Sequence, residues 1–246
     1  MSAAAELRAL DIDTPALLLD LDLVEANIAL MAAFARSREI ALRPHAKTHK
    51  CAALGRLQLA AGAAGLCCAK LGEAEALAAE GVGPLLITSP LVGARKLARL
   101  AHLALHAPGL AVVVDDVAQA EALALAMAAA GPVVDVLVDV DPGMARTGCA
   151  TIDAALAVGR AVDGAPDLRL RGVQCYAGTI QHLADAGTRA EAARGVHRHL
   201  RATLAAFAAA ELPLEVVTGS GTGTFALDAG AGLFTELQVG SYLVMD

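Results

Sequence analysis

A basic, histidine-rich segment near the start of the sequence carries the residues best suited to covalent chemistry. It reads RPHAKTHK at 43–50 and directly follows a β-rich run at 39–44. Continued strand alternation would place His45 and Lys47 on one face. Apolar walls and neighbouring cations lower the pKa of such a lysine and favour its nucleophilic neutral form. A solvated basic loop is the alternative, but polar residues so dense at a strand end favour a catalytic role for Lys47 and His45.

A glycine-rich turn provides a candidate anion site. It reads GSGTGT at 219–224, so it contains Gly221, Thr222 and Gly223. Glycines let the backbone approach an anion, and successive N–H groups can surround it. A second turn, at Gly240 and Ser241, could complete the site. An ordinary flexible loop is the alternative. The position of both turns, after the seventh and eighth predicted strands, favours phosphate binding.

Two further side chains end predicted strands. Arg146, in DVDPGMARTG at 139–148, could meet an anionic oxygen of a ligand or pair with Asp141 at the surface, and the segment alone favours neither. Tyr176, in QCYAG at 174–178, could hydrogen-bond in a site or cap the core. Both segments end strands on the side where barrel enzymes place their active sites.

The histidines and cysteines show no metal-binding pattern. The five cysteines are odd in number, and the adjacent pair Cys67 and Cys68 would point to opposite faces of a strand. His197 and His199 are two apart on a predicted helix and do not share a face. We therefore expect buried, reduced cysteines and no metal ligands within these residues.

Strand and helix signals alternate along the chain, which is typical of parallel βαβ units. Eight β-rich runs occur at about 39–44, 65–69, 84–89, 111–115, 133–141, 169–176, 214–219 and 236–240. Helical stretches occur at about 50–62, 72–80, 92–105, 116–130, 151–163 and 188–211. Eight strands predict a (β/α)8 TIM barrel. A doubly wound open sheet is the alternative, but the GxGxxG signature of its dinucleotide-binding members is absent after the first strand.

Two segments lie outside the barrel count. Residues 13–22, which include PALLLDLD, predict an N-terminal strand followed by a helix at about 23–37, and the chain ends on the apolar, strand-like SYLVMD.

The 246 residues, 57% of them hydrophobic, predict one folded barrel domain over 1–246. The net charge of −7, without a basic stripe, argues against nucleic acid as a partner. With no membrane-length apolar run and no signal pattern, we expect a cytoplasmic enzyme.

Taken together, these motifs resemble a known family. RPHAKTHK, GLCCAKLGEAEALAAEG, DVDPGMARTG, Q-x-Y-x-G, VTGSGTGT and ELQVGSY are similar to the D-threonine aldolase and D-serine dehydratase family. Its members are fold-type III pyridoxal 5′-phosphate enzymes related to alanine racemase. The resemblance covers nearly the whole chain and implies an alanine racemase-type N-terminal barrel.

The resemblance implies a role for each candidate residue. Lys47, rather than Lys50, would hold pyridoxal 5′-phosphate as a Schiff base. The turns at 221–223 and 240–241 would bind its phosphate. Arg146 would lie near the phenolic oxygen, and Tyr176 near the imine.

The resemblance also implies features beyond residue 246. Family members continue into a C-terminal β-domain that supplies a His and an Asp or Cys as ligands for Mn²⁺ or Zn²⁺, and segment 13–22 would pair with that domain. The chain is therefore either a fragment or a protein that has lost the metal-dependent step. We expect a homodimer that acts on small D-amino acids as a D-threonine aldolase. A D-serine dehydratase and a non-catalytic pyridoxal phosphate-binding protein remain alternatives.

Overall fold

Eight parallel strands form a single sheet in the computed structural model, which describes residue 13 and residues 15–244. The strands are β1 (Ala41–Leu42), β2 (Leu66–Cys68), β3 (Leu85–Ile87), β4 (Ala111–Val114), β5 (Val134–Asp139), β6 (Leu168–Cys175), β7 (Val216–Gly219) and β8 (Glu236–Leu237). All eight match predicted runs. The strand order is β1-β8-β7-β6-β5-β4-β3-β2, so the first strand lies beside the last.

The two edges of this sheet meet around His45 and close the barrel. His45 forms an isolated parallel bridge with Cys67, and the Cys67 N–H donates to the Pro44 carbonyl at 2.8 Å. On the other side, the His45 N–H donates to the Val239 carbonyl at 2.9 Å. Closure through sequential neighbours confirms the TIM barrel and excludes the doubly wound sheet, whose strand order reverses part-way.

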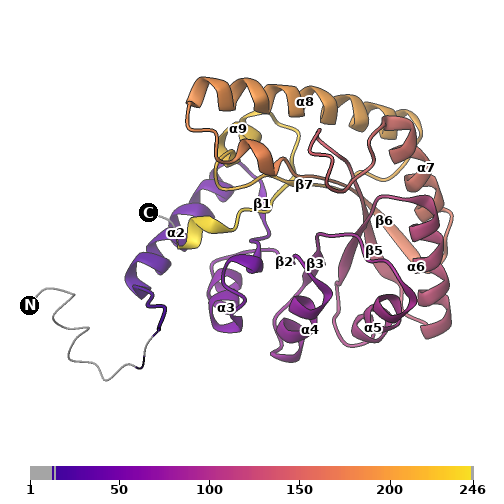
Figure 1. The fold of residues 1–246 in the computed structure, drawn as a ribbon, viewed down its shortest axis with the longest axis horizontal. Helices are drawn as coiled ribbons and strands as arrows, with labels where there is room; N and C mark the ends of the chain where they lie inside the picture. Colours follow the sequence, from indigo (N-terminus) through magenta and orange to yellow (C-terminus); the bar gives the residue numbers. More distant parts are fainter. Residues whose placement is uncertain (1–12, 14, 245–246) are drawn as a thin grey trace, which may run out of the picture.

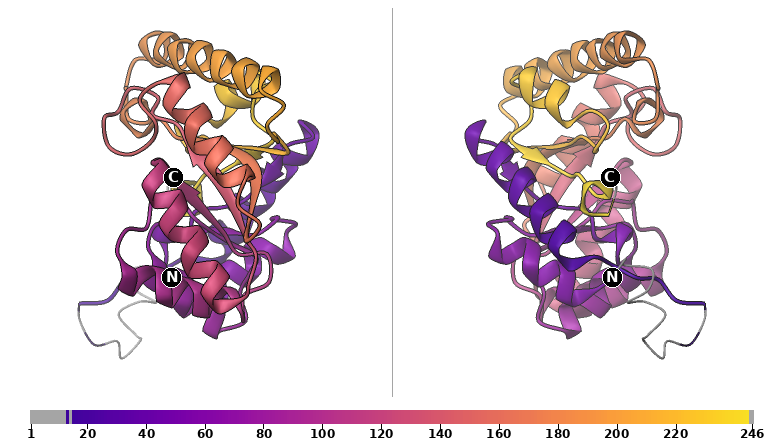
Figure 2. Two further views of the ribbon diagram at one scale, coloured as in Figure 1. Left: turned by 90° about the vertical axis from the view of Figure 1, so that its right-hand side faces the viewer. Right: turned by 90° about the vertical axis from the view of Figure 1, so that its left-hand side faces the viewer.

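Helices cover the outside of the barrel in sequence order (Figures 1 and 2). They are α2 (Leu21–Ser37), α3 (Ala52–Ala60), α4 (Leu71–Ala79), α5 (Ala94–Ala104), α6 (Val117–Ala130), α7 (Ile152–Asp163), α8 (Ala186–Ala209) and the short α9 (Phe225–Gly230). Several begin at polar caps: Asp116, Thr151 and Asp185 each accept an N–H of the first helical turn. The sequence did not predict α9.

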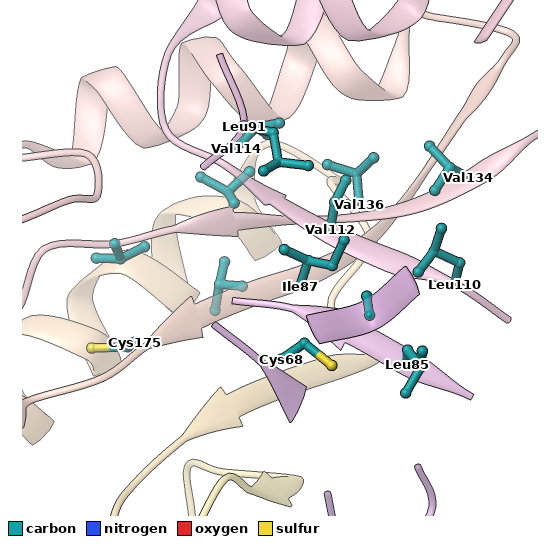
Figure 3. Close-up of a cluster of buried hydrophobic side chains, with 14 of the residues drawn as sticks. Cys68, Leu85, Ile87, Leu91, Leu110, Val112, Val114, Val134, Val136 and Cys175 are labelled. Carbon is teal, nitrogen blue, oxygen red and sulfur yellow. The ribbon is translucent and has the colours of Figure 1, made fainter. Parts of the chain in front are cut away.

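The main hydrophobic core lies between the sheet and these helices. Figure 3 shows outward-facing strand residues that belong to it, among them Leu85, Ile87, Val112 and Val136. They are at most 2% exposed. Continuous apolar strands of this kind are expected when helices cover one face of a parallel sheet and a packed interior covers the other.

The barrel interior has two unlike walls. On β2 to β5, the inward residues Cys67, Leu86, Val113 and Leu137 form a separate apolar cluster. On β6 to β8, and just after β8 and β1, the inward residues are polar and linked by hydrogen bonds. These residues are Gln174, Thr218, Glu236, Gln238 and Arg43. Apolar side chains therefore fill only one side of the barrel interior.

The structure at the chain ends contradicts one prediction and leaves another untested. Residues 15–20 form no strand: Asp20 caps α2 by accepting the Leu23 N–H at 3.2 Å, so the helix already begins at Leu21. The strand predicted over 13–22 was expected to pair with a C-terminal β-domain, and the described residues supply no partner, so that pairing stays a prediction. At the other end, Ser241–Leu243 form the 3-10 helix η3, packed against α2 with Asn27 donating to the Leu243 carbonyl. Residues 14 and 245–246 lie outside the described residues.

Among the helices that the structure describes, none is both long enough and apolar enough to span a bilayer.

Replacing Gly172 by alanine tests how tightly β6 and β7 pack. Gly172 has φ +141°, and an added Cβ would collide with the backbone of Val216. We expect a loss of about 3 kcal/mol or more in the free energy of unfolding, measured by urea denaturation. Gly131→Ala is the matched control, because Gly131 also has positive φ but has open space around it. It should cost about 1 kcal/mol. Equal losses in both variants would mean that the backbone contact is not limiting.

Candidate active site at the carboxyl ends of the strands

A cavity of about 390 Å³ opens at the carboxyl ends of β1, β6, β7 and β8. Its lining comprises Lys47, Thr48, Tyr176, Gln181, His182, Gly221, Thr222, Gly223, Gln238, Gly240 and Ser241. A smaller hollow of about 60 Å³ shares Lys47, Tyr176 and Gln238 with it and adds His45 and Arg146. Every candidate site residue predicted from the sequence therefore lines one of two connected hollows.

Lys47 lies in the short 3-10 helix η1 (Ala46–Thr48) rather than on a continued strand. The alternation argument that paired it with His45 is therefore wrong, although both side chains reach the smaller hollow. Burial, and secondarily the Arg146 cation, lower the pKa of Lys47 from its ordinary value. Lys50 instead points outward: it is 63% exposed and forms an ion pair with Glu73 at 3.6 Å.

His45 is buried, and its contacts fix its tautomer. Its Nδ1 accepts the Lys47 N–H at 3.4 Å, so its Nε2 carries the hydrogen and donates to Thr88 Oγ1 at 3.1 Å. Burial and the nearby Lys47 lower the pKa of His45 to about 3. The imidazole is therefore neutral and holds the backbone of the lysine segment.

The aromatic ring of Tyr176 lies close to two cationic side chains. The Lys47 Nζ lies 5.1 Å from the ring centroid and the Arg146 Cζ lies 5.6 Å from it. Burial raises the pKa of Tyr176, although Arg146 opposes this. Arg146 forms no ion pair with Asp141 among the described residues, since the Asp141 carboxylate accepts the N–H groups of residues 143–145. The geometry thus favours a ligand-facing Arg146 over the surface pair.

The two glycine turns form the opposite wall and are tied together. The Tyr242 N–H donates to Thr222 Oγ1 at 3.0 Å. Of the N–H groups predicted to bind phosphate, that of Gly223 donates to Gln181 Oε1 at 2.9 Å. Within the part of the chain that the structure describes, the N–H groups of the other predicted residues make no hydrogen bond; these are Gly221, Thr222, Gly240 and Ser241. Four unpaired donors beside one cavity suit an anion.

The described residues contain no cluster of three His, Cys, Asp or Glu side chains suited to holding a metal ion. Of the five cysteines, Cys67, Cys68, Cys149 and Cys175 are buried, as expected, and Cys51 is half-buried.

Comparison with known proteins identifies the fold family. The alanine racemase N-terminal domain matches residues 19–246, which is most of the chain. The chain belongs to the alanine racemase N-terminal domain family. This result confirms the fold and the resemblance inferred from the motifs.

Several relatives of this alanine racemase-type barrel act on D-amino acids. D-threonine aldolase from Arthrobacter sp. is 40% identical over 235 residues, which cover 96% of this chain and 62% of that enzyme. The crystal structure of D-threonine aldolase from Filomicrobium marinum superposes with a TM-score of 0.93 at 45% identity, covering 96% and 64% of the two chains. D-threo-3-hydroxyaspartate dehydratase from Delftia sp. HT23 gives 0.86 at 30% identity, covering 96% and 62%. The chain thus spans less than two thirds of these relatives.

Sequence reasoning did not select three glutamines of this alanine racemase-type site. Gln174 and Gln238 belong to the polar wall, and strand alternation could have found them, because each lies two residues before a selected residue, Tyr176 and Gly240 respectively. Gln181 lies after the 3-10 helix η2 (Gly178–Ile180), where no periodicity applies. Only the folded loop shows that its side chain reaches the glycine turn.

The buried carboxyl of Asp139 leads to a testable prediction about how the stability of the fold depends on pH. Burial raises the pKa of Asp139 to about 6, against donors from Gln174 and Thr147 that lower it. Because the folded-state pKa exceeds the unfolded value of 3.8, the protonated carboxyl stabilises the fold below about pH 4 and this contribution is lost as pH rises through 6. We expect wild-type stability to fall by on the order of 1–3 kcal/mol over that window relative to Asp139→Asn.

Urea unfolding of both proteins between pH 4 and 8 measures this difference. A pH dependence that is the same in wild type and Asp139→Asn would show that Asp139 does not titrate in this range.

Proposed function

We propose that this chain is the pyridoxal 5′-phosphate-binding barrel of a lyase that acts on D-β-hydroxy amino acids, with D-threonine aldolase as the best-supported reaction. The observation that carries the proposal is the single cavity in which Lys47 faces two glycine turns with unpaired N–H groups. The family and the aldolases among its relatives support the same reading.

The residues of the cavity fit this cofactor at both ends. One end offers a lysine whose pKa is lowered, as attack on a carbonyl carbon requires. The other end offers backbone donors at Gly221, Thr222, Gly240 and Ser241 for a phosphate. A Cβ on Gly240 would lie 2.8 Å from Thr48 Oγ1 and 3.3 Å from the His45 carbonyl oxygen, so the glycine lets this turn pack closely against the lysine segment.

Pyridoxal phosphate, when bound, withdraws electrons from the substrate α-carbon. Lys47 is the residue that would hold it covalently and then exchange protons at its Nζ. Tyr176 would shield one side of Lys47 with its ring, and Arg146 would offer a cation to an anionic ring oxygen. Both ring nitrogens of His45 already have hydrogen-bond partners, the Lys47 N–H and Thr88 Oγ1, so its proposed role is positioning rather than proton transfer.

The substrate class and the metal rest on the relatives. Their names include a D-threonine aldolase and a 3-hydroxy-D-aspartate aldolase, which share a β-hydroxyl on a D-amino acid. A variant of D-threo-3-hydroxyaspartate dehydratase, 31% identical to this chain, has been solved in a metal-free form. We propose that a divalent metal, Mn²⁺ or Zn²⁺, serves the whole protein through ligands outside the described residues. A homodimer in the cytoplasm is part of the same proposal.

A dehydratase is the second candidate, because the Delftia relative is one. The two reactions give different products from D-threonine. An aldolase releases glycine and acetaldehyde, whereas a dehydratase releases ammonia and 2-oxobutanoate. Assays of the protein expressed from its whole reading frame, with D-threonine and D-serine and with or without Mn²⁺ or Zn²⁺, should yield glycine from D-threonine. Ammonia as the main product would favour the dehydratase. Retained cofactor without either product would favour a non-catalytic binding protein.

Lys47 is expected to be the residue that binds the cofactor covalently. Borohydride reduction of the protein with pyridoxal phosphate, followed by peptide mass spectrometry, should place the added mass on Lys47. Lys47→Ala should lose it. Lys50→Asn is the control, since asparagine tolerates the positive φ of residue 50, and it should keep the label. Label lost in Lys50→Asn but kept in Lys47→Ala would refute the assignment.

Arg146 is expected to keep the Lys47 amine reactive at lower pH. Its charge helps lower the pKa of Lys47, so Arg146→Leu should raise that pKa and move the midpoint of pH-dependent labelling upward. The shift should be a few tenths of a pH unit to about one unit. Arg95→Leu, at an exposed position of α5, should leave the midpoint unchanged. An unmoved midpoint in Arg146→Leu would remove Arg146 from the site.

A further inference from the structure

A chain of hydrogen bonds runs from helix α8 on the outside of the barrel to the glycine turn after β7. His197 Nε2 contacts Asp228 Oδ1 at 2.7 Å, and Asp228 Oδ2 contacts Thr224 Oγ1 at 2.6 Å. Thr224 Oγ1 in turn contacts Gln181 Nε2 at 2.9 Å, and Gln181 Oε1 contacts the Gly223 N–H at 2.9 Å. The chain joins α8, α9, the loop after β6 and the turn.

The first three members of this chain are buried. Exposed fractions are 8% for His197, 4% for Asp228 and 2% for Thr224. The His197 ring also packs edge-on against Phe234, with ring centroids 6.3 Å apart. Buried polar groups are costly unless every donor and acceptor is paired, so these contacts are held firmly.

The carboxylate of Asp228 dictates the direction of every bond in the chain. A carboxylate only accepts, so the Thr224 hydroxyl must donate to it and the His197 Nε2 must carry a hydrogen. Thr224 has then used its single hydrogen and can only accept from Gln181. This contact fixes the Gln181 amide, with its NH2 group toward Thr224 and the Ala177 carbonyl and its oxygen toward Gly223. A flipped amide would place donor against donor at Gly223.

Gln181 also determines how closely the turn can pack. A Cβ on Gly221 would lie 2.5 Å from Gln181 Oε1, and one on Gly223 would collide with the Gln181 carbonyl. Ser220, just before them, has a positive φ of 73°. Such backbone conformations persist only where the surroundings hold them. The turn therefore packs directly against Gln181.

We propose that Gln181 is a positioning residue for the phosphate turn, locked in orientation by Thr224, Asp228 and His197. By binding the Gly223 N–H, Gln181 holds the turn in the shape that leaves the N–H groups of Gly221 and Thr222 for the phosphate group of the ligand. This inference rests on the proposed function, because the ligand is the phosphate of the proposed cofactor. Gln181 itself takes no part in bond making.

The test compares two ligands that differ only in the phosphate. Equilibrium titrations with pyridoxal phosphate and with pyridoxal are made on wild type, Gln181→Met and Thr224→Val, with melting temperatures as a check of folding. Gln181→Met removes the hydrogen bonds at similar volume. Thr224→Val keeps the volume and removes the hydroxyl that fixes the orientation of the Gln181 amide. Both should bind pyridoxal phosphate about tenfold more weakly and pyridoxal within about twofold of wild type.

Matched controls separate positioning from general destabilisation. Gln119 is a buried glutamine elsewhere that likewise links two loops, to Asp115 and Leu91, and Gln119→Met should leave the ratio of the two affinities unchanged. His197→Gln keeps a donor and should retain the wild-type ratio better than His197→Leu. If Gln181→Met fails to fold, Thr224→Val decides.

The outcomes are distinct. Equal weakening of both ligands, or none, in Gln181→Met and Thr224→Val would overturn the positioning role alone. Failure of the wild-type protein to bind either ligand would overturn the proposed function together with this inference.

Discussion

The backbone of His45 is the point on which the rest of the structure depends. Its N–H donates to the Val239 carbonyl just after β8, and the same residue forms a bridge with Cys67 of β2. One residue therefore joins both edges of the sheet. The same residue accepts the Lys47 N–H through its side chain. The residue that closes the barrel therefore also positions the lysine segment. A TIM barrel gathers its strand ends at one face, and here that geometry brings a lysine that follows the first strand against glycine turns that follow the last two.

The sequence predicts most of this fold, because its signals are local and repeated. Each of the eight strands matches a β-rich run, and the residues chosen from RPHAKTHK, DVDPGMARTG and VTGSGTGT meet at the predicted face. Position after a strand was enough to find them. Apolar content alone cannot supply a partner strand for segment 13–22, so its pairing with a C-terminal β-domain stays a prediction, and Asp20 begins a helix. Strand alternation failed at Lys47, where the chain turns into a 3-10 helix.

What the sequence could not show is how polar groups pair across the interior. Gln174 and Gln238 contact each other from β6 and just after β8, which are far apart in the chain, and Gln174 reaches Asp139 on β5. No periodic pattern reports which donor meets which acceptor. The polar wall faces an apolar wall of Cys67, Leu86 and their neighbours. Nonpolar packing therefore fills one side of the barrel interior, and hydrogen bonds link the side chains on the other. The candidate site sits over the bonded side, where positions are held most tightly.

The circular order of the strands also governs when the pocket can exist. Lys47 and Gly240 stand near opposite ends of the chain but face one another in the finished barrel. During synthesis the lysine leaves the ribosome long before the turn it must face has been made. Contacts between such distant segments form late and slowly in folding. Until β8 docks beside β1, Lys47 is an ordinary basic residue. The proposed capture of a phosphorylated aldehyde would therefore follow the docking of β8 and could not guide the steps before it.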